Sequence, residues 1–466
     1  MDLLDEKSPV AGTDAQERLN SAYEYIKSLV NILNERGGQE LIKAWLGSIS
    51  KLEVLEFIEP DKGKAIRMFQ SLNDRGVQLT KLDIVKSLLV YYSNRYLNGE
   101  LDDFIVKNFG QIFKCFNTVR RLARETGYQI DHINGKDFSE DAVLRYHYFS
   151  FDSSNHDTKG GDINSPTTEE VLKDFLKETL KNLRSDQTKL KAFISDYTSD
   201  LKAFFDGLKG LVSETRNNRE IFLLFVFQGV STALYPLIIR LYMMQQLFVS
   251  TEDGSGRVLF DIIELTDFRV FKLRGTTPAV GIVKLTRSLP RLTAIEISDR
   301  LKEFCQRFMP DTLMRTRLLD QAIYPNYGLV RLLLDLDENN RELLHLLPLS
   351  LAELIELKRL GLTVEHIFPQ TFEFFDVTNY GFDEDADYSS NNHFLGNLTL
   401  LEGSINTACN NRRVEEKMSA TNLYSASKMT SPRHLAARHL NDCFSKDHLL
   451  KRGREITETI LRRWSI

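Results

Sequence analysis

Apolar residues recur three or four positions apart over most of this chain, a spacing that predicts helices. This spacing predicts a helix at residues 17–34 that stops at Arg36-Gly37-Gly38. The residues from Thr80 to Asp83 predict the N-cap of a further helix. Between these helices the pattern predicts a strand at residues 51–58 and a glycine turn at residues 73–76. Longer amphipathic stretches continue the helical pattern at residues 167–212, 292–308 and 327–336. We therefore predict a predominantly α protein.

The most apolar stretch, residues 221–249, is long enough to cross a membrane. It is interrupted by Gly229, Pro236 and Arg240, so we predict a buried helical hairpin that breaks near Gly229 or Pro236. A spanning helix is the alternative. The first fourteen residues lack the apolar core of a signal peptide. The sequence thus predicts a cytoplasmic protein without a membrane segment.

The hydrophobic pattern changes near the C-terminus. A short strand is predicted at residues 361–364, a second strand at residues 397–401, and a helix from Ser404 onward, which is a ββα order. The chain is expected to divide into three parts: residues 1–100, a helical middle region at residues 101–354, and a C-terminal domain at residues 355–466.

Composition limits the class of protein and the number of domains. The chain has 466 residues, of which 42% are hydrophobic and 27% charged, as expected for a soluble protein of two or three domains. Its four cysteines lie far apart without a Cys-x-x-Cys pair, which argues against a zinc knuckle and against a disulfide framework. The net charge is −5, so the chain as a whole is not basic. Any affinity for nucleic acid must therefore come from a local surface.

Charge is distributed unevenly in the C-terminal domain. From Glu365 to Glu402 there are eight acids and no lysine or arginine, whereas from Ser404 to Ile466 there are twelve bases against six acids. A basic flank of this kind suits DNA, because each phosphate that is neutralised releases counterions. A solvated helical face is the alternative interpretation.

A split motif in this domain carries the candidate chemistry. It consists of Glu365-His366-Ile367-Phe368-Pro369-Gln370, then Leu395-Gly396-Asn397 ahead of the second strand, and finally Asn406. Phosphodiester hydrolysis needs a deprotonated water and a positive charge near the phosphate oxygens. His366 is a candidate general base, and Glu365 points to the opposite side of the strand, where it is a candidate ligand for a hard ion such as Mg²⁺. Asn406 would add a neutral oxygen ligand.

The split motif resembles the C-terminal HNH (His-Me finger, ββα-metal) nuclease domain of GmrSD-like modification-dependent, or type IV, restriction endonucleases. It is also similar to the HNH domain of RNA-guided CRISPR nucleases, in which an aspartate stands where this chain has Glu365. The resemblance implies that His366 is the general base and that Glu365 and Asn406 bind Mg²⁺ or Mn²⁺. It further implies that Asn397 orients the hairpin or the histidine.

Basic residues and one further histidine complete the expected site. Lys417 looks like part of the basic helix that follows the motif in this family, and there it would contact a DNA phosphate. Arg412 and Arg413 begin the same basic flank and are expected to bind DNA. His393, in the polar loop before the second strand, is the main rival histidine. Solvation is its expected state, and a place beside the metal is the alternative.

The N-terminal part carries a second resemblance. Residues 65–86 are similar to the closing part of the ParB-like N-terminal domain of the same restriction enzymes. In the family, the upstream half of that domain carries an Asp-Gly-Gln-Gln-Arg nucleotide motif, and this string is absent from the sequence. Residues 1–100 are therefore expected to be a remnant of that domain, and no nucleotide-binding residue is assigned. A separate chain with the nucleotide-sensing half is an expected partner.

Together these features predict a metal-dependent DNA endonuclease that restricts modified or foreign DNA, including phage DNA. A homodimer would place two single-metal sites on one duplex. One alternative is a non-catalytic subunit of a multi-chain defence complex, which binds DNA or regulates the other subunits. A second alternative is a helical interaction scaffold.

Overall fold

The computed structural model describes the greater part of the chain: residues 14–52, 79–125, 128–154, 156, 167–251, 254–320, 322–371, 375–439 and 443–466. The chain divides into two compact units, residues 1–71 and residues 72–466. The turn predicted at residues 73–76 lies outside the described residues, as does all but the start of the strand predicted at residues 51–58.

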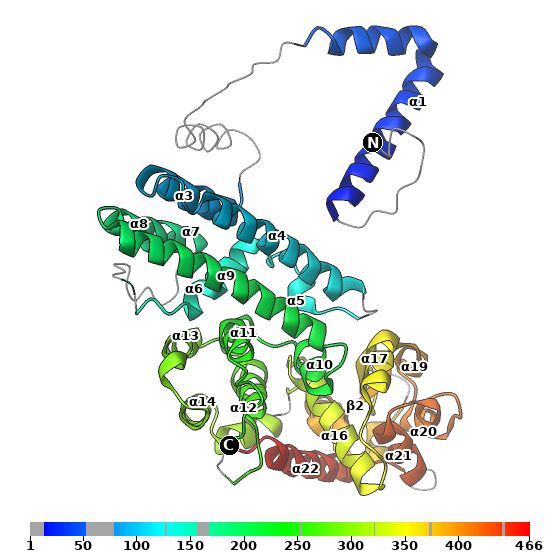
Figure 1. Ribbon diagram of the computed structural model, residues 1–466. Coiled ribbons are helices and arrows are strands. Elements are labelled where there is room, and N and C mark those ends of the chain that lie inside the picture. Colours follow the sequence, from blue (N-terminus) through cyan, green and yellow to red (C-terminus); the bar gives the residue numbers. More distant parts are fainter. Residues whose placement is uncertain are drawn as a thin grey trace. The chain divides into compact units, whose positions relative to one another are not determined.

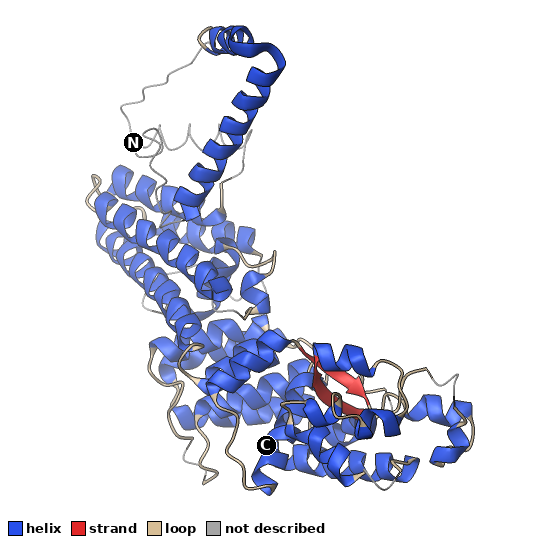
Figure 2. Ribbon diagram, turned by 90° about the vertical axis from the view of Figure 1, so that its right-hand side faces the viewer, coloured by secondary structure: helices blue, strands red, loops and turns tan. Residues whose placement is uncertain are grey.

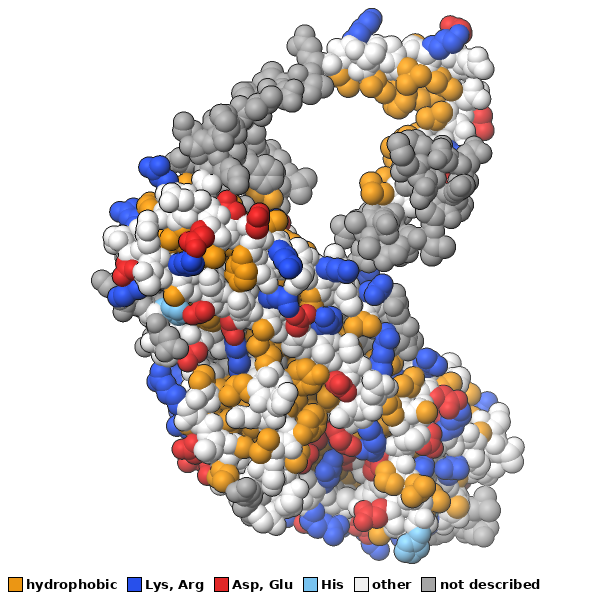
Figure 3. All heavy atoms as spheres, viewed as in Figure 1, with side chains coloured by type: hydrophobic (Ala, Val, Ile, Leu, Met, Phe, Trp, Pro, Cys, Tyr) orange, Lys and Arg blue, Asp and Glu red, His pale blue; other side chains and the backbone are white. Residues whose placement is uncertain are grey.

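The described part of the first unit is the long helix α1 (Asp14–Ile49). Gly38 interrupts it with φ 61° and ψ −161°, a backbone conformation open mainly to glycine. The predicted stop at Gly37-Gly38 is therefore a break after which the helix resumes. Several large apolar side chains of α1 are exposed, among them Tyr25, Ile26, Trp45 and Leu46. Figure 3 shows hydrophobic side chains gathered along one side of the helix.

The first described helix of the second unit is α3 (Lys81–Tyr96), whose N-cap is the one predicted from the sequence. The Thr80 hydroxyl oxygen accepts a hydrogen bond from the Asp83 backbone N–H at 3.1 Å, which satisfies one of the free donors of the first turn. Helical elements then follow one another along the middle of the chain: α4 (Asp102–Glu125), α5 (Asp131–Asn134), α6 (Glu140–Ser150), α7 (Thr168–Glu170), η1 (Val171–Lys177), α8 (Glu178–Leu183) and α9 (Gln187–Glu214). Figure 1 shows α4 and α9 running side by side.

The most apolar stretch folds as a broken helical hairpin. It contains α10 (Arg219–Phe222), η2 (Leu223–Gln228), η3 (Thr232–Leu234) and α11 (Tyr235–Met243). The predicted break falls at Gly229, which has φ 65°, and Pro236 stands in the first turn of α11, where its missing N–H costs nothing. Among the described residues, no helix is long and apolar enough to cross a membrane.

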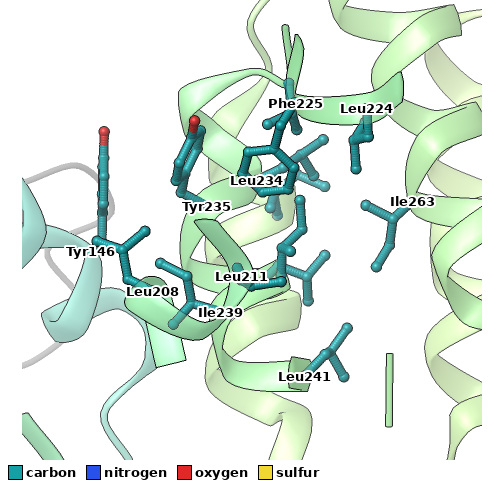
Figure 4. Close-up of a cluster of buried hydrophobic side chains, with 14 of the residues drawn as sticks. Tyr146, Leu208, Leu211, Leu224, Phe225, Leu234, Tyr235, Ile239, Leu241 and Ile263 are labelled. Carbon is teal, nitrogen blue, oxygen red and sulfur yellow. The ribbon is translucent and has the colours of Figure 1, made fainter. Parts of the chain in front are cut away.

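The hairpin contributes many side chains to the larger of the two hydrophobic cores formed by the described residues. Figure 4 shows part of this core, where side chains of α9 and α11 meet those of η2 and α12 (Leu259–Thr266): Leu208, Leu211, Leu224, Phe225, Ile239 and Ile263 are labelled. The helices after α12 complete this part of the unit: η4 (Asp267–Leu273), α13 (Ala279–Ser288), η5 (Leu289–Arg291), α14 (Ala294–Phe308), α15 (Asp311–Leu318), α16 (Leu329–Leu343) and α17 (Leu351–Leu360).

A two-stranded antiparallel sheet follows α17. Strand β1 (Leu362–His366) pairs with β2 (Leu398–Glu402) so that His366 lies opposite Leu398, and Figure 2 shows the sheet among helices. Helix α19 (Gly403–Cys409) comes directly after β2, so the predicted order of two strands and a helix is present. The remaining elements complete the unit, and most of them pack around a smaller core: η6 (Val377–Tyr380), α18 (Asp385–Asn391), η7 (Leu395–Asn397), α20 (Val414–Ser419), η8 (Tyr424–Ala426), α21 (Thr430–Arg438) and α22 (Lys446–Arg463).

Two glycines allow the loop before β2 to approach α22. A Cβ atom on Gly396 would overlap the Leu449 carbonyl oxygen, and a Cβ atom on Gly453 would overlap the Phe394 ring. Gly396 therefore serves close packing. The contact holds the start of β2, and with it Asn397, against the last long helix.

Candidate active site

Glu365 lies in the interior, on the side of β1 that faces α20 and η8. Its side chain is 5% exposed, and its Oε1 accepts hydrogen bonds from Lys417 Nζ at 2.7 Å and from the Tyr424 hydroxyl at 3.2 Å. Burial raises the pKa of the Glu365 carboxyl, while the Lys417 ammonium and the Tyr424 hydroxyl oppose that rise. Lys417 thus supplies the positive charge that offsets this buried carboxylate.

His366 points to the other side of the strand and contacts different residues. Its Nε2 lies 3.1 Å from His393 Nδ1, and its Nδ1 lies 3.0 Å from the side-chain nitrogen of Gln370. Tyr324 meets the His366 ring edge-on at a centroid distance of 4.5 Å and stacks on His393 at 5.2 Å. The alternation of a β-strand therefore separates the carboxylate from the imidazole, as the sequence pattern predicts.

The hydrogen bonds around His366 define its tautomer. The Gln370 amide nitrogen only donates, so His366 Nδ1 accepts and the proton of the neutral ring lies on Nε2. That proton is then donated to His393 Nδ1. Gln370 is exposed whereas Tyr324 and His393 cover the other edge, so the Nδ1 edge is the solvent side.

Burial also decides the charge of this histidine. It lowers the pKa of His366 to about 3, and the nearby charges of His393 and Lys417 act in the same direction. The imidazole is therefore neutral at physiological pH. A neutral imidazole can accept a proton, which is the state that a general base requires.

Asn397 braces the chain directly after His366. It is fully buried, and its side-chain amide forms a pair of hydrogen bonds with the Phe368 backbone: the Phe368 N–H donates to Oδ1 at 2.8 Å, and Nδ2 donates to the Phe368 carbonyl at 3.1 Å. Nδ2 also donates to the Asn392 carbonyl at 2.7 Å. The loop that carries His393 and the end of β1 are thereby tied together.

Asn406 lies on the Glu365 side of β1. Its Nδ2 donates to Thr363 Oγ1 at 2.7 Å and to the Val364 carbonyl at 3.2 Å. Thr363 and Glu365 are two positions apart in the strand, so their side chains share one side. The two candidate ligands, Glu365 and Asn406, are therefore on the same side of the strand, opposite His366.

The structure corrects the expected placement of Lys417. Its side chain is 1% exposed and donates to Glu365 and to the His366 carbonyl, the latter at 2.7 Å, so it faces the interior and not a DNA phosphate. Arg412 and Arg413 are exposed, and Arg412 lies 4.0 Å from Glu416. Both arginines lie at the surface beside α20.

The donor set fits a single hard cation better than a closed metal cage. Among the described residues, no group of three or more His, Cys, Asp or Glu side chains is placed to hold a metal ion. Mg²⁺, however, commonly takes one or two carboxylates and fills its other positions with water and phosphate oxygens. Glu365 and the amide oxygen of Asn406 suit that pattern, provided that Lys417 shares the carboxylate.

Several contributors to this site are not visible in the sequence pattern. Tyr324 precedes the motif by more than forty positions and lies in a loop, so nothing in its neighbourhood indicates that it stacks on His393. Gln370 and His393 are both polar residues of loops, a setting that usually indicates solvation. The spacing of Lys417 in a basic segment indicated a surface role, whereas its place opposite Glu365 depends on how α20 packs.

Comparison with known proteins assigns this part of the chain. Residues 316–459 match the family of GmrSD restriction endonucleases, C-terminal domain. The matched stretch includes Tyr324, both strands, Asn406, Lys417 and most of α22. Searches of curated proteins and of solved structures found no match. The C-terminal part of the chain is therefore similar to the C-terminal domain of restriction endonucleases.

Proposed function

We propose that the C-terminal domain is an HNH-type nuclease that hydrolyses DNA phosphodiester bonds with the help of Mg²⁺ or Mn²⁺. The observation that carries the proposal is the arrangement on β1. A neutral imidazole, His366, lies on one side of the strand, and two oxygen donors, Glu365 and Asn406, lie on the other. The C-terminal domain of a restriction endonuclease family makes DNA the expected substrate.

His366 would take the proton of the attacking water at Nδ1, the edge that faces solvent. For this the amide of Gln370 must move aside, and an exposed glutamine side chain can do so at little cost. Protonation at Nδ1 leaves the Nε2 proton donated to His393 Nδ1. His393, as the acceptor of that proton, holds the His366 ring in the orientation in which Nδ1 faces solvent.

Glu365 and Asn406 would hold the divalent ion, which supplies positive charge to the phosphate oxygens when bound. Lys417 keeps Glu365 ionised in the interior, because its ammonium offsets the desolvation of the carboxylate. Asn397 holds Phe368 and so fixes the direction in which β1 ends. Lys417 and Asn397 are thus positioning residues, each of which holds one neighbouring residue in place.

The biological role that we propose rests on the family match alone. A GmrSD-like enzyme with this domain would restrict modified or foreign DNA, such as phage DNA, in the cytoplasm. One metal site per chain cuts one strand at a time, so cleavage of both strands calls for a homodimer or for two successive nicks. A partner chain with the nucleotide-sensing half would control when cleavage occurs.

One observation favours a second candidate function. Lys417 lies directly on the carboxylate that would bind the metal, and a carboxylate neutralised in this way attracts a cation less strongly. A DNA-binding or regulatory subunit that does not cut is the function consistent with that ion pair. The two functions differ in metal binding and in cleavage.

A cleavage assay with supercoiled plasmid distinguishes the two functions. We expect the full chain to nick plasmid with Mg²⁺ or Mn²⁺ and to stop when a chelator removes the metal. We also expect Glu365→Gln to weaken Mn²⁺ binding measured by calorimetry, because a neutral amide replaces the charged ligand. If Mn²⁺ does not bind and plasmid stays supercoiled while DNA is still bound, the non-catalytic function is the correct one.

A further inference from the structure

A second feature of the C-terminal domain is a cavity of about 430 Å³ between α16, α21 and α22. Figure 1 shows α21 and α22 close to α16. Four cationic side chains line the cavity: Arg438, Lys451, Arg452 and Arg462. Of the described residues that line it, two are acidic, Glu455 and Glu458. None of these residues belongs to the site around His366.

The ion pairs of the region leave this cavity positively charged. Glu458 is paired with Arg315 of α15, so its charge is already compensated. Within the part of the chain that the structure describes, Arg438, Lys451 and Arg452 form no ion pair with a carboxylate. Lys451, Glu455, Glu458 and Arg462 are spaced three or four positions apart and therefore share one side of α22.

Arg452 connects the cavity to the start of β2, in the sheet of the candidate active site. Its Nη1 donates to the carbonyl oxygens of Gly396 and Leu398, both at 2.8 Å, and these two residues flank Asn397. All of its hydrogen-bond partners in the described chain are neutral carbonyls. Burial lowers the pKa of Arg452 to about 10, so the guanidinium is still charged at neutral pH, and the nearby carboxylate of Glu455 offsets only part of the cost of burial. An anion in the cavity would offset more of it.

We propose that this cavity binds phosphate groups of the DNA backbone and so holds the duplex beside the β1–β2 hairpin. The inference rests on the proposed nuclease function, which requires DNA next to His366. Arginine and lysine side chains at a concave surface suit phosphate oxygens, because guanidinium groups donate in pairs and ammonium groups act as compact charges. The acidic loop before β2 would repel the same backbone, which restricts the path of the duplex to the basic helices.

DNA binding by two charge-matched variants tests the proposal. The cavity variant is Arg438→Glu with Lys451→Glu. The control is Lys284→Glu with Arg291→Glu, two exposed cations that do not line the cavity. All four substitutions are made in full-length His366→Ala protein, so that no substrate is cut. The affinity for a fluorescent duplex is then measured by anisotropy over a range of salt concentrations.

We expect the cavity variant to bind DNA on the order of 100-fold more weakly at ~0.1 M salt, because each of its two lost cations contributes roughly tenfold there. The slope of log affinity against log salt should fall by about two. The control should change affinity by less than about threefold, because distant charges are screened. Equal affinities of the cavity variant and the control would overturn the proposal.

The same phosphate chemistry could come from a free nucleotide. Calorimetry with a nucleoside triphosphate distinguishes the two sources: binding that is lost in the cavity variant, with DNA affinity retained, would overturn DNA as the ligand. Plasmid nicking by the otherwise unmodified chain is measured in parallel. DNA binding without nicking contradicts the nuclease function alone, whereas unchanged DNA affinity of the cavity variant contradicts the cavity proposal alone.

Discussion

Lys417 Nζ lies 2.7 Å from Glu365 Oε1, and the two side chains are 1% and 5% exposed. The same ammonium donates to the His366 carbonyl, so one cation joins α20 to the strand that carries both motif residues. A charge pair in this position fixes the end of β1. It also sets the ionisation state of the candidate metal ligand.

Removing the lysine should destabilise the fold strongly. Lys417→Met leaves Glu365 buried without its counter-charge, which we expect to lower the free energy of unfolding by about 3–5 kcal/mol. Adding Glu365→Gln should restore much of the loss. Lys428→Met, which breaks the exposed pair with Glu356, serves as the control and should cost at most about 1 kcal/mol. If both lysine variants lower the free energy of unfolding equally in chemical denaturation, the buried pair contributes no more to stability than the exposed one.

His393 should affect the rate of cleavage more than the binding of DNA. His393→Ala removes the acceptor of the His366 Nε2 proton, so we expect nicking at saturating DNA to slow by about tenfold or more. Tyr324→Phe keeps the stacked ring and should retain most of the rate. An unchanged rate in His393→Ala, or a loss explained by weaker DNA binding, would remove the histidine from the mechanism.

The close approach of the β2 loop to α22 makes a stability prediction. Gly396→Ala places a methyl group against the Leu449 carbonyl, and the helix must shift, which we expect to cost about 1–3 kcal/mol. Gly110→Ala is the matched control, because that glycine is in the exposed interior of α4 with nothing near its missing Cβ. The control should gain up to about 1 kcal/mol. Thermal unfolding of both variants measures the difference.

Asp337 should make stability depend on pH. Burial raises its pKa from 3.8 to about 6, although its Oδ1 accepts a hydrogen bond from the Ser431 N–H at 2.6 Å. A carboxyl with a raised pKa favours the folded state fully below the unfolded pKa and loses that contribution as pH rises through 6. Between pH ~4 and ~6.5 this group should lower the free energy of unfolding by about 3 kcal/mol.

Asp337→Asn tests this pH dependence, because the amide keeps the acceptor for Ser431 and cannot ionise. The stability of the variant relative to the unsubstituted chain should rise by about 3 kcal/mol across that pH range. A difference that is constant with pH, measured by denaturation at several pH values, would show that Asp337 titrates normally.

Much of the fold could be predicted from local patterns. The N-cap at Thr80 and the break at Gly229 depend on single residues whose backbone preferences are strong. The two strands around the motif stand out because short apolar runs follow glycine. The resumption of α1 after Gly38 could not be predicted in the same way, since a glycine pair indicates a stop and not a kink.

Of the candidate site, only the motif residues could be predicted from the sequence. Glu365, His366, Asn397 and Asn406 are marked by their order and spacing, but the partners that set their chemistry come from elsewhere. Tyr324 and Lys417 reach the motif through the packing of a loop and of α20, which no local pattern encodes. Lys417 is the clearest case: a basic residue in a basic segment is expected at the surface, and tertiary structure places it inside.

The most direct measurement is the nicking rate of supercoiled DNA by the full chain and by His366→Ala, each with Mg²⁺ or Mn²⁺. His345→Asn, a change at an exposed histidine that is not among the contacts described for His366, serves as the control. We expect His366→Ala to lose nicking by about a hundredfold or more while it binds DNA as tightly as the unsubstituted chain and the control. Equal nicking rates for all three proteins would contradict this expectation.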